Sequence, residues 1–247
     1  MTIAIRRSPL IIAADQMGRS DILRLAHALR DLKLGGWKLG SVLFRKGCGP
    51  EMLGWMKTET GGGRIFADTK IHNTPDVMKE TAAYLAEAGA DMMTVMAASG
   101  IAGIRAACDG APEEVDIYVV GVLTTMEEDD CSLVFDRRPN EQQHRFFLLT
   151  EKAFKGLKDP RRPCLICSPQ DLDLVKIVSW TQKPNTATPG VRSPGADPHD
   201  QYRIGTPAHA VASGATNIIM GRQITQAKDP VGAVKNIYEE IGFDWTR

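Results

Sequence analysis

The chain has 247 residues, a length that fits either two small domains or one large domain such as an α/β barrel. Its 30 Lys and Arg residues balance 30 Asp and Glu residues. The resulting net charge of zero excludes general nucleic-acid binding, which needs a basic surface. A hydrophobic fraction of 43% is typical of globular proteins and excludes wholesale disorder.

No stretch of the sequence predicts a membrane span or a targeting segment. Apart from the N-terminal region, the longest apolar run is Ile117–Leu123, far below the roughly 18 residues that a transmembrane helix needs. The apolar run that follows Arg7 stops at Asp15, too early for the apolar part of a signal peptide. Five scattered cysteines fit a reducing compartment better than a disulfide framework. We therefore expect a cytoplasmic protein.

Short apolar runs alternate along the chain with stretches of helical periodicity. The runs predict buried strands at Leu10–Asp15, Trp37–Phe44, Arg64–Lys70, Met92–Ala97, Ile117–Thr124, Pro163–Ser168, Thr186–Val191 and Asn217–Gly221. The periodic stretches predict helices at Asp21–Lys33, Glu51–Lys57, Pro75–Ala88, Ile101–Cys108, Glu141–Lys155, Gln170–Ile177, Pro207–Ala212 and Val231–Ile241. Ser20 is the expected N-cap of the first helix, and Gly89 the expected end of the third.

Eight strand-then-helix units predict a single TIM (β/α)8 barrel over residues 1–247, with an open doubly wound sheet as the alternative. Two segments interrupt the pattern. The acidic run Glu127–Asp130 predicts a solvated loop and the start of a helix. The segment Pro189–Thr206 has no periodicity and is long for a loop inside a domain. In a barrel it would lie over the mouth where active sites are found.

Four predicted strands carry charged residues, although buried parallel strands are normally apolar throughout. Asp15 ends the first strand, Lys38 lies in the second, and Asp68 and Lys70 end the third. Residues i and i+2 of a strand share a side, so these charges are expected to cluster at the mouth of a barrel. Ion pairs that only tie strands together are the alternative, but two lysines and two aspartates at strand ends favour a site.

The eighth strand ends in Gly221 and Arg222, a combination that suits a phosphate because a backbone N–H lies beside a guanidinium fork. Many barrels bind phosphate with the loops that follow strands seven and eight. Arg192 and Gln201, in the long seventh loop, are candidates to close over the same group. An ordinary exposed loop is the alternative for these two residues.

Cysteine and histidine patterns predict no metal site. Cys164 and Cys167 have the spacing of a redox or zinc motif, but no second such pair accompanies them. They also lie in a predicted strand, where residues three apart face opposite sides. Five scattered histidines show neither HxH nor HExxH spacing.

The segments described so far also match a known family in their order along the chain. The matching segments are Leu10–Asp15, Trp37–Gly40, Asp68–Pro75, Glu87–Asp91, Gly121–Thr124 and Cys167–Pro169. The most specific ones are Thr188–Arg192, Asp200–Arg203, Gly205–Pro207, Gly221–Arg222 and Ile224–Thr225. Over nearly its whole length the chain resembles the bacterial orotidine 5′-phosphate decarboxylases. The resemblance implies a TIM barrel, a nucleotide monophosphate substrate, a homodimer with shared active sites, and neither cofactor nor metal.

The resemblance also implies roles for individual residues. Lys70 would donate a proton to C6 as carbon dioxide leaves, and Asp68 would orient it and crowd the substrate carboxylate. Asp15 and Lys38 would contact the ribose and the charge network. A fixed ammonium beside a developing carbanion stabilises its charge and can then protonate it. The implied substrate-binding residues are Asp15, Thr124, Pro189, Arg192, Gln201, Gly221 and Arg222.

Three positions depart from the family pattern. Asn73 stands where the family's DxKxxD motif has a second aspartate, which the partner subunit supplies. Val77 aligns with a threonine that reaches the partner's ribose, unless a shift of one residue places Asp76 there. Met96 replaces the histidine usual in the bacterial form.

Three hypotheses stay open because of these departures: a decarboxylase of orotidine 5′-phosphate, a related lyase for another phosphorylated substrate, and a non-catalytic nucleotide-phosphate binder. The long phosphate loop favours the first. The retention of Lys38, Asp68 and Lys70 counts against the third.

Overall fold

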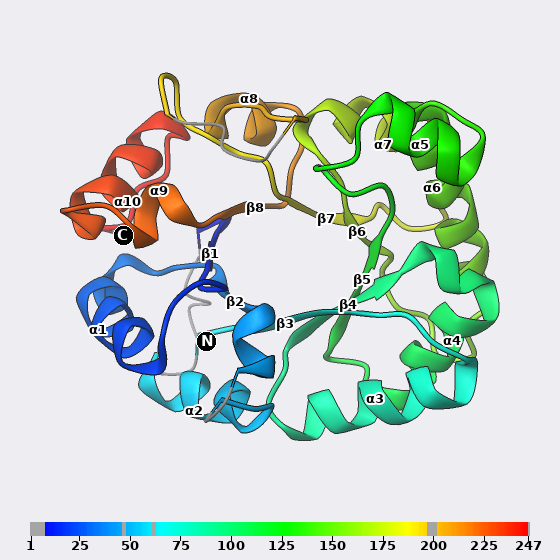
Figure 1. Cartoon of the computed structure of the whole chain (residues 1–247), viewed down its shortest axis with the longest axis horizontal. Coiled ribbons are helices and arrows are strands. Elements are labelled where there is room, and N and C mark those ends of the chain that lie inside the picture. Colours follow the sequence, from blue (N-terminus) through cyan, green and yellow to red (C-terminus); the bar gives the residue numbers. More distant parts are fainter. Residues whose placement is uncertain (1–7, 46–47, 61–62, 197–201, 247) are drawn as a thin grey trace, which may run out of the picture.

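A computed structural model describes residues 8–45, 48–60, 63–196 and 202–246. Eight parallel strands pair in sequence order and close into a barrel (Figure 1). The strands are β1 Leu10–Ala13, β2 Gly36–Leu39, β3 Ile65–Ile71, β4 Met92–Met96, β5 Asp116–Val120, β6 Cys164–Ile166, β7 Asn185–Thr188 and β8 Asn217–Met220. The predicted TIM barrel is thereby confirmed, and the doubly wound sheet is wrong because β1 pairs with both β2 and β8.

The helices that connect successive strands lie around the outside of the barrel (Figure 1). The α-helices are α1 Arg19–Leu29, α2 Glu51–Glu59, α3 Pro75–Glu87, α4 Gly100–Gly110, α5 Glu128–Phe135, α6 Pro139–Lys155, α7 Leu172–Ile177, α8 Pro207–Ala212, α9 Arg222–Thr225 and α10 Pro230–Glu240. Short 3-10 helices are η1 Arg30–Leu32, η2 Ser41–Phe44, η3 Ala97–Ser99 and η4 Pro169–Asp171. Among the described residues, no helix is both long and apolar enough to cross a bilayer.

Alternation along the strands divides the core into two parts. Inside the barrel, one residue from each of seven strands forms a buried apolar layer: Ile11, Phe66, Met92, Tyr118, Cys164, Ala187 and Ile219. Their strand neighbours, such as Leu10 and Ile12, face outward and pack against the helices. Burial of each such aliphatic side chain stabilises the folded state by about 1.5–3 kcal/mol relative to leaving it exposed. Because side chains alternate with a period of two, the next inward positions lie one layer closer to the mouth.

The second strand is shorter than the expected Trp37–Phe44. It ends at Leu39, since the backbone bends at Gly40 (φ −112°, ψ −106°) and continues as η2. The prediction of Ser20 as the first N-cap is also wrong, because α1 begins at Arg19 after Gly18. Gly89 is confirmed as a helix end, since it follows the last turn of α3 with φ +107°, a conformation that glycine adopts without strain.

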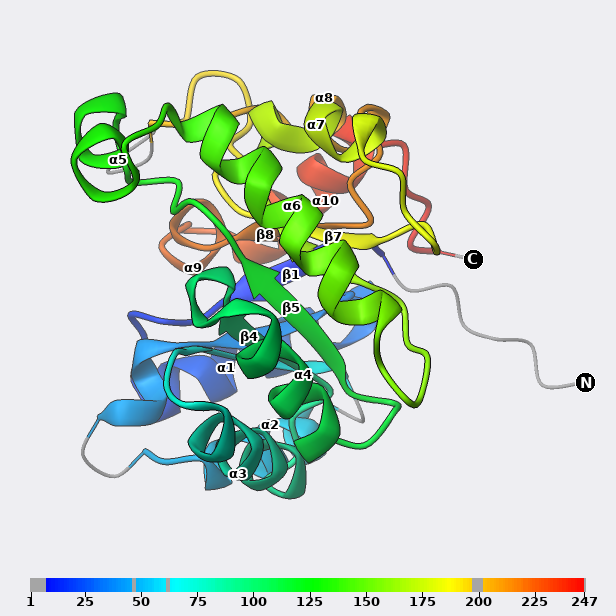
Figure 2. The same cartoon turned by 90° about the vertical axis from the view of Figure 1, so that its right-hand side faces the viewer.

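Two helices, α5 and α9, are not among the eight that the periodicity predicts. The acidic run begins α5, where Glu127 and Asp130 form a capping box, so the predicted helix start is confirmed. The rest of α5 lacks an apolar stripe, and its Leu133 is 90% exposed. In Figure 2 this helix stands out from the barrel at the end where the strands finish. The single turn of α9 directly follows β8 and begins with Arg222.

Candidate active site

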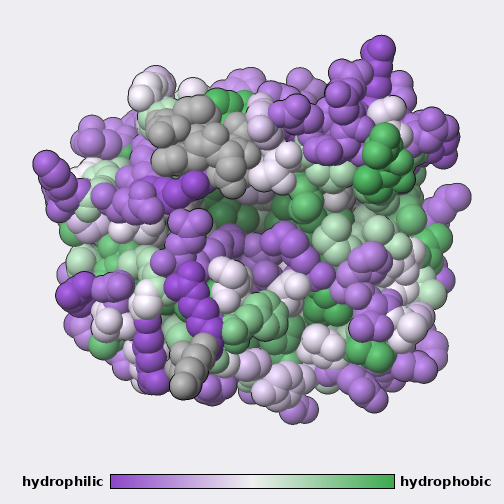
Figure 3. Space-filling model, in the orientation of Figure 1, coloured by the Kyte–Doolittle hydropathy of each residue, from purple (hydrophilic) through white to green (hydrophobic). Residues whose placement is uncertain are grey.

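A cavity of about 360 Å³ lies in the mouth of the barrel, where the strands end. Figure 1 looks into this mouth, and the same view in space-filling form is hollowed near its centre (Figure 3). The volume falls within the usual range for small-molecule sites. Of the residues expected in the site, these line the cavity: Asp15, Lys38, Asp68, Lys70, Thr124, Pro189, Arg192, Gly221 and Arg222.

Two expected site residues are not part of this wall. Asn73 is exposed at the end of β3, and its side-chain oxygen accepts a hydrogen bond from the backbone N–H of Thr74 at 2.8 Å. Gln201 lies outside the residues that the structure describes. The remaining wall adds polar residues to which the sequence analysis gave no role, namely Gln16, Thr125, Ser168 and Thr225. All four lie in the segments that follow strands β1, β5, β6 and β8, and this position is the signal that could have found them.

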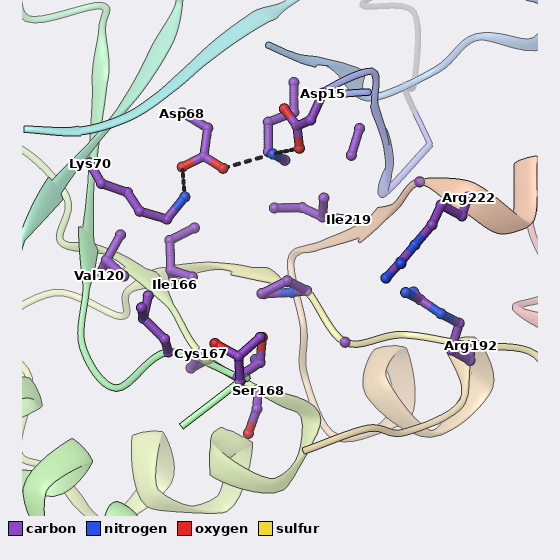
Figure 4. Close-up of a pocket in the computed structure, with 18 of the residues that line it drawn as sticks. Asp15, Asp68, Lys70, Val120, Ile166, Cys167, Ser168, Arg192, Ile219 and Arg222 are labelled. Carbon is purple, nitrogen blue, oxygen red and sulfur yellow. Dashed lines mark hydrogen bonds and ion pairs between the residues drawn. The ribbon is translucent and has the colours of Figure 1, made fainter. Parts of the chain in front are cut away.

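Four charged side chains form a continuous chain of alternating sign along one side of the cavity. The Lys38 ammonium donates to Asp15 Oδ2 at 2.5 Å and to Asp68 Oδ2 at 2.7 Å. The other oxygen of Asp68, Oδ1, accepts from Lys70 Nζ at 2.8 Å. Figure 4 shows this arrangement, with Lys70 extending from β3 toward Asp68. The two aspartates thus hold both lysines in fixed positions.

Burial and charge act in opposite directions on this chain. Burial by itself lowers the pKa of the Lys38 ammonium, but the charges of Asp68 and Asp15 outweigh it and raise that pKa above its ordinary value. Burial likewise acts to raise the pKa of Asp68, but Lys38 and Lys70 hold that pKa well below its usual range. Both groups are therefore charged at neutral pH. Lys70 differs in being 42% exposed, so its ammonium can reach a molecule in the cavity.

An irregularity in β3 positions Lys70. Between Ala67 and Ile71 the strand uses four steps, while its partner β4 uses two, from Met93 to Val95. Such bulges re-aim side chains next to active sites. Within this bulge Lys70 has φ +48°, a left-handed conformation that is unfavourable for a residue with a Cβ atom. The expected clustering of Asp68 and Lys70 is present, but it arises from this bulge and not from regular alternation.

Gly40 positions Asp15 at the other end of the charge chain. Its backbone N–H donates to Asp15 Oδ1 at 2.7 Å, and the Ser41 hydroxyl donates to the Asp15 carbonyl oxygen at 2.9 Å. A Cβ atom on residue 40 would lie only 2.6 Å from Asp15 Oδ1. A side chain at this position would therefore displace the Asp15 carboxylate from its present place.

Two arginines stand on the opposite side of the cavity. Arg192 follows β7 and is largely buried, and Arg222 follows β8; in Figure 4 the ends of their side chains converge. The loop that carries Arg192 is closed by hydrogen bonds from Arg192 N to Gly205 O at 2.9 Å and from Gly205 N to Gly190 O at 3.1 Å. Paired guanidinium groups are suited to a phosphate because each can donate two parallel hydrogen bonds.

A buried ion pair anchors the far end of the same loop. Arg203 donates to Asp171, whose other carboxylate oxygen accepts from the backbone N–H and the hydroxyl of Ser168 at 3.1 and 2.8 Å. Ser168 lines the cavity. The loop after β7 is thus joined to the cavity wall at the end of β6. The Ser-x-x-Asp spacing of a capping box was the sequence signal for the contact between Ser168 and Asp171.

Apolar side chains line the rest of the cavity. In Figure 4, Ile219 lies between the charge chain and the arginines, and Val120 and Ile166 lie beside Lys70; Cys167 lines the cavity as well. Burial raises the pKa of the Cys167 thiol, so this group stays protonated and is no nucleophile. Cys164 belongs to the apolar layer inside the barrel. In the described part of the chain, no three His, Cys, Asp or Glu side chains converge as metal ligands.

The barrel and its charged cavity define the chain as a TIM-barrel enzyme, and comparison with known proteins gives its family. Residues 8–237 match the family model described as "Orotidine 5'-phosphate decarboxylase / HUMPS family". The chain belongs to this family and is a carbon–carbon lyase.

Similar proteins include orotidine 5′-phosphate decarboxylases of several bacteria. The protein of that name from Moorella thermoacetica is 35% identical over 217 residues, covering 84% of this chain and 82% of the relative. The one from Pseudomonas fluorescens is 33% identical over 246 residues, covering 95% and 98%. The crystal structure of the Lactobacillus acidophilus enzyme superposes with a TM-score of 0.72 at 26% identity, covering 94% of this chain and 98% of that one.

Proposed function

We propose that the chain converts orotidine 5′-phosphate to uridine 5′-phosphate and carbon dioxide, a step of pyrimidine biosynthesis. The observation that carries this proposal is the division of the cavity. An ammonium held by Asp68 stands at one side, two arginines stand at the other, and Ile219 lies between them. Orotidine 5′-phosphate has groups that match these two sides, with a carboxylate on its base at one end and a phosphate at the other.

In the proposed reaction, the bond between C6 and the carboxylate carbon breaks and its electron pair stays on C6. Lys70 Nζ, fixed beside the reacting carbon, stabilises this charge and then donates a proton to C6. The neutral amine regains a proton from solvent. Asp68 holds the Lys70 ammonium at 2.8 Å and its own negative charge disfavours the substrate carboxylate in the ground state. No cofactor or metal takes part. Release of carbon dioxide and formation of uridine 5′-phosphate by the purified chain is the direct test.

The phosphate end is expected to supply binding energy far from the reacting carbon. We expect Arg222→Ala to lower kcat/KM for orotidine 5′-phosphate by about 10²-fold, since a charge-assisted pair to phosphate is worth roughly 2–3 kcal/mol. The matched measurement uses orotidine, which lacks the phosphate. Its kcat/KM should change less than about threefold. An equal loss with both substrates would contradict the assignment of Arg222 to the phosphate.

We also propose a homodimer in which each subunit completes the other's active site. Asn73 supports this proposal, because it is exposed and lies outside the cavity wall of its own subunit. It is thus available to face a second copy. The α3 helix that follows also carries exposed apolar side chains, Val77 and Tyr84. A cytoplasmic location is proposed as well, supported by five cysteines that are all free thiols.

Asn73 leads to a prediction about rate. Asn73→Asp should raise kcat about tenfold, because a carboxylate near the substrate carboxylate disfavours the bound substrate relative to the transition state. Steady-state kinetics at neutral pH, with Asn73→Gln as the uncharged control, measures this effect. A fall in kcat with Asp would mean that the chain is adapted to a neutral residue at this position. That result would favour a different phosphorylated substrate.

A further inference from the structure

Thr94 in β4 contacts both Asp68 and Lys70, although it carries no charge and does not line the cavity. Its side chain is on the inner face of the barrel, one layer closer to the mouth than Met92, and the residue is 1% exposed. Its hydroxyl accepts a hydrogen bond from the Lys70 backbone N–H at 2.8 Å. The same hydroxyl donates to Asp68 Oδ1 at 3.0 Å. A hydroxyl has one proton and two lone pairs, so both bonds form at once.

The first of these bonds stabilises an unfavourable backbone. Lys70 lies in the bulge of β3 with φ +48°, a conformation that persists only where the surroundings impose it. The hydroxyl of Thr94 gives the Lys70 N–H a partner in this conformation. Because the bulge directs the Lys70 side chain, the hydroxyl also determines where the ammonium lies.

The second bond orients the carboxylate that holds the ammonium. Asp68 Oδ1 accepts from Thr94 and from Lys70 Nζ, while Oδ2 accepts from Lys38. With donors on both oxygens, the plane of the carboxylate is fixed. Without Thr94, Oδ1 would retain only the half-exposed Lys70 side chain as its donor.

We propose that Thr94 is a positioning residue for proton transfer by Lys70, acting on the backbone of Lys70 and on Asp68 at once. This inference rests on the proposed function. A displacement of the ammonium by about 1 Å lowers a reaction rate by roughly 10²-fold even when the substrate still binds. Thr94 therefore affects kcat and leaves substrate affinity nearly unchanged.

The test compares Thr94→Val, which keeps the shape and removes the hydroxyl, with Thr94→Ser, which keeps the hydroxyl. For Thr94→Val we expect kcat to fall about 10²-fold and KM to change less than about threefold. Thr94→Ser should retain kcat within about fivefold. Thr186→Val is the matched control, because Thr186 is also a buried strand threonine whose hydroxyl accepts a backbone N–H, from Thr216 at 2.9 Å. It should lose stability and keep kcat.

A second readout does not depend on turnover. Amide hydrogen exchange of Lys70 should become at least about tenfold faster in Thr94→Val than in the parent and Thr94→Ser. Should Val prevent folding, Thr94→Ala takes its place in both measurements. The inference would be overturned if the hydroxyl-free variant had the same kcat as the parent, or if Thr94→Val and Thr94→Ser lost kcat equally. An unchanged rate of Lys70 amide exchange in the hydroxyl-free variant would overturn it as well. A parent without turnover but with this exchange pattern would instead refute the proposed decarboxylation and leave the positioning by Thr94 intact.

Discussion

Replacing Lys70 by Met is expected to lower kcat for orotidine 5′-phosphate by about 10⁴-fold or more, because proton donation and charge stabilisation are lost together. The variant should fold normally. Lys70 is half-exposed, and Asp68 keeps its hydrogen bonds from Lys38 and Thr94 when the Lys70 ammonium is removed. Affinity for uridine 5′-phosphate should change less than about tenfold, since the arginines are untouched.

The control for this variant is Lys57→Met. Lys57 in α2 is 43% exposed and pairs with Asp91 at 2.6 Å, so the loss of charge and of an ion pair is closely matched. Its kcat should equal that of the parent. Steady-state kinetics and calorimetric titration give the two quantities. Retention of more than about a hundredth of the parent's kcat in Lys70→Met would contradict the role of proton donor.

Replacing Lys38 by Met is expected to have the largest effect on stability. The Lys38 side chain is 9% exposed and is the shared donor to Asp15 and Asp68, so its removal leaves two carboxylates facing each other with no cation between them. Removing one partner of a buried charge pair typically lowers the free energy of unfolding by about 3–5 kcal/mol. Chemical denaturation at pH 7 measures this difference. A loss below about 1 kcal/mol would mean that the charge chain is solvated in solution.

The stability lost in Lys38→Met should depend on pH, and the pKa shifts of Asp68 and Lys38 give the direction. In the parent, the depressed pKa of Asp68 gives stability above its ordinary value of 3.8, and this contribution is lost as pH falls. The raised pKa of Lys38 gives stability below 10.5, and this contribution is lost as pH rises through the folded-state value. Both contributions are thus present between these limits.

In Lys38→Met, the burial of Asp68 and the charge of Asp15 are offset only by the Lys70 ammonium, on the far side of Asp68 from Asp15. A carboxyl pKa in the folded variant then rises above its unfolded value, and protonation relieves the repulsion as pH falls. The stability difference between parent and variant should therefore narrow from pH 7 to pH 5. Chemical denaturation of parent and variant at both pH values measures this difference in the free energy of unfolding. A difference that widens from pH 7 to pH 5 would contradict the role of Lys38 in the charge chain.

Much of the barrel could be predicted because its strands carry the pattern of doubly buried parallel strands. The positions of Asp15, Lys38 and Asp68 followed from the same alternation, since an inward residue near a strand end must reach the mouth. The extra residues in β3 could not be predicted, because a bulge leaves no change in composition. Thr94 gave no signal either. Threonine is common in strands, and only the contacts with Lys70 and Asp68, 24 and 26 residues away, distinguish it.

Helix α5 and the end of β2 illustrate two other limits. A helix without an apolar stripe has no periodicity to detect, and Leu133 is almost fully exposed. Gly40 ends β2 through a hydrogen bond to Asp15, a residue 25 positions earlier in the chain. The end of β2 thus depends on a contact that forms only in the folded barrel.

The most direct measurement is conversion of orotidine 5′-phosphate by the parent chain in deuterium oxide, with Lys70→Met beside it. The expected result is uridine 5′-phosphate from the parent with a single deuterium at C6, because the exchangeable proton of the Lys70 ammonium is the one transferred. Lys70→Met should form almost none. Tight binding of uridine 5′-phosphate by a parent that forms no product would contradict the proposed decarboxylation and identify the chain as a nucleotide binder.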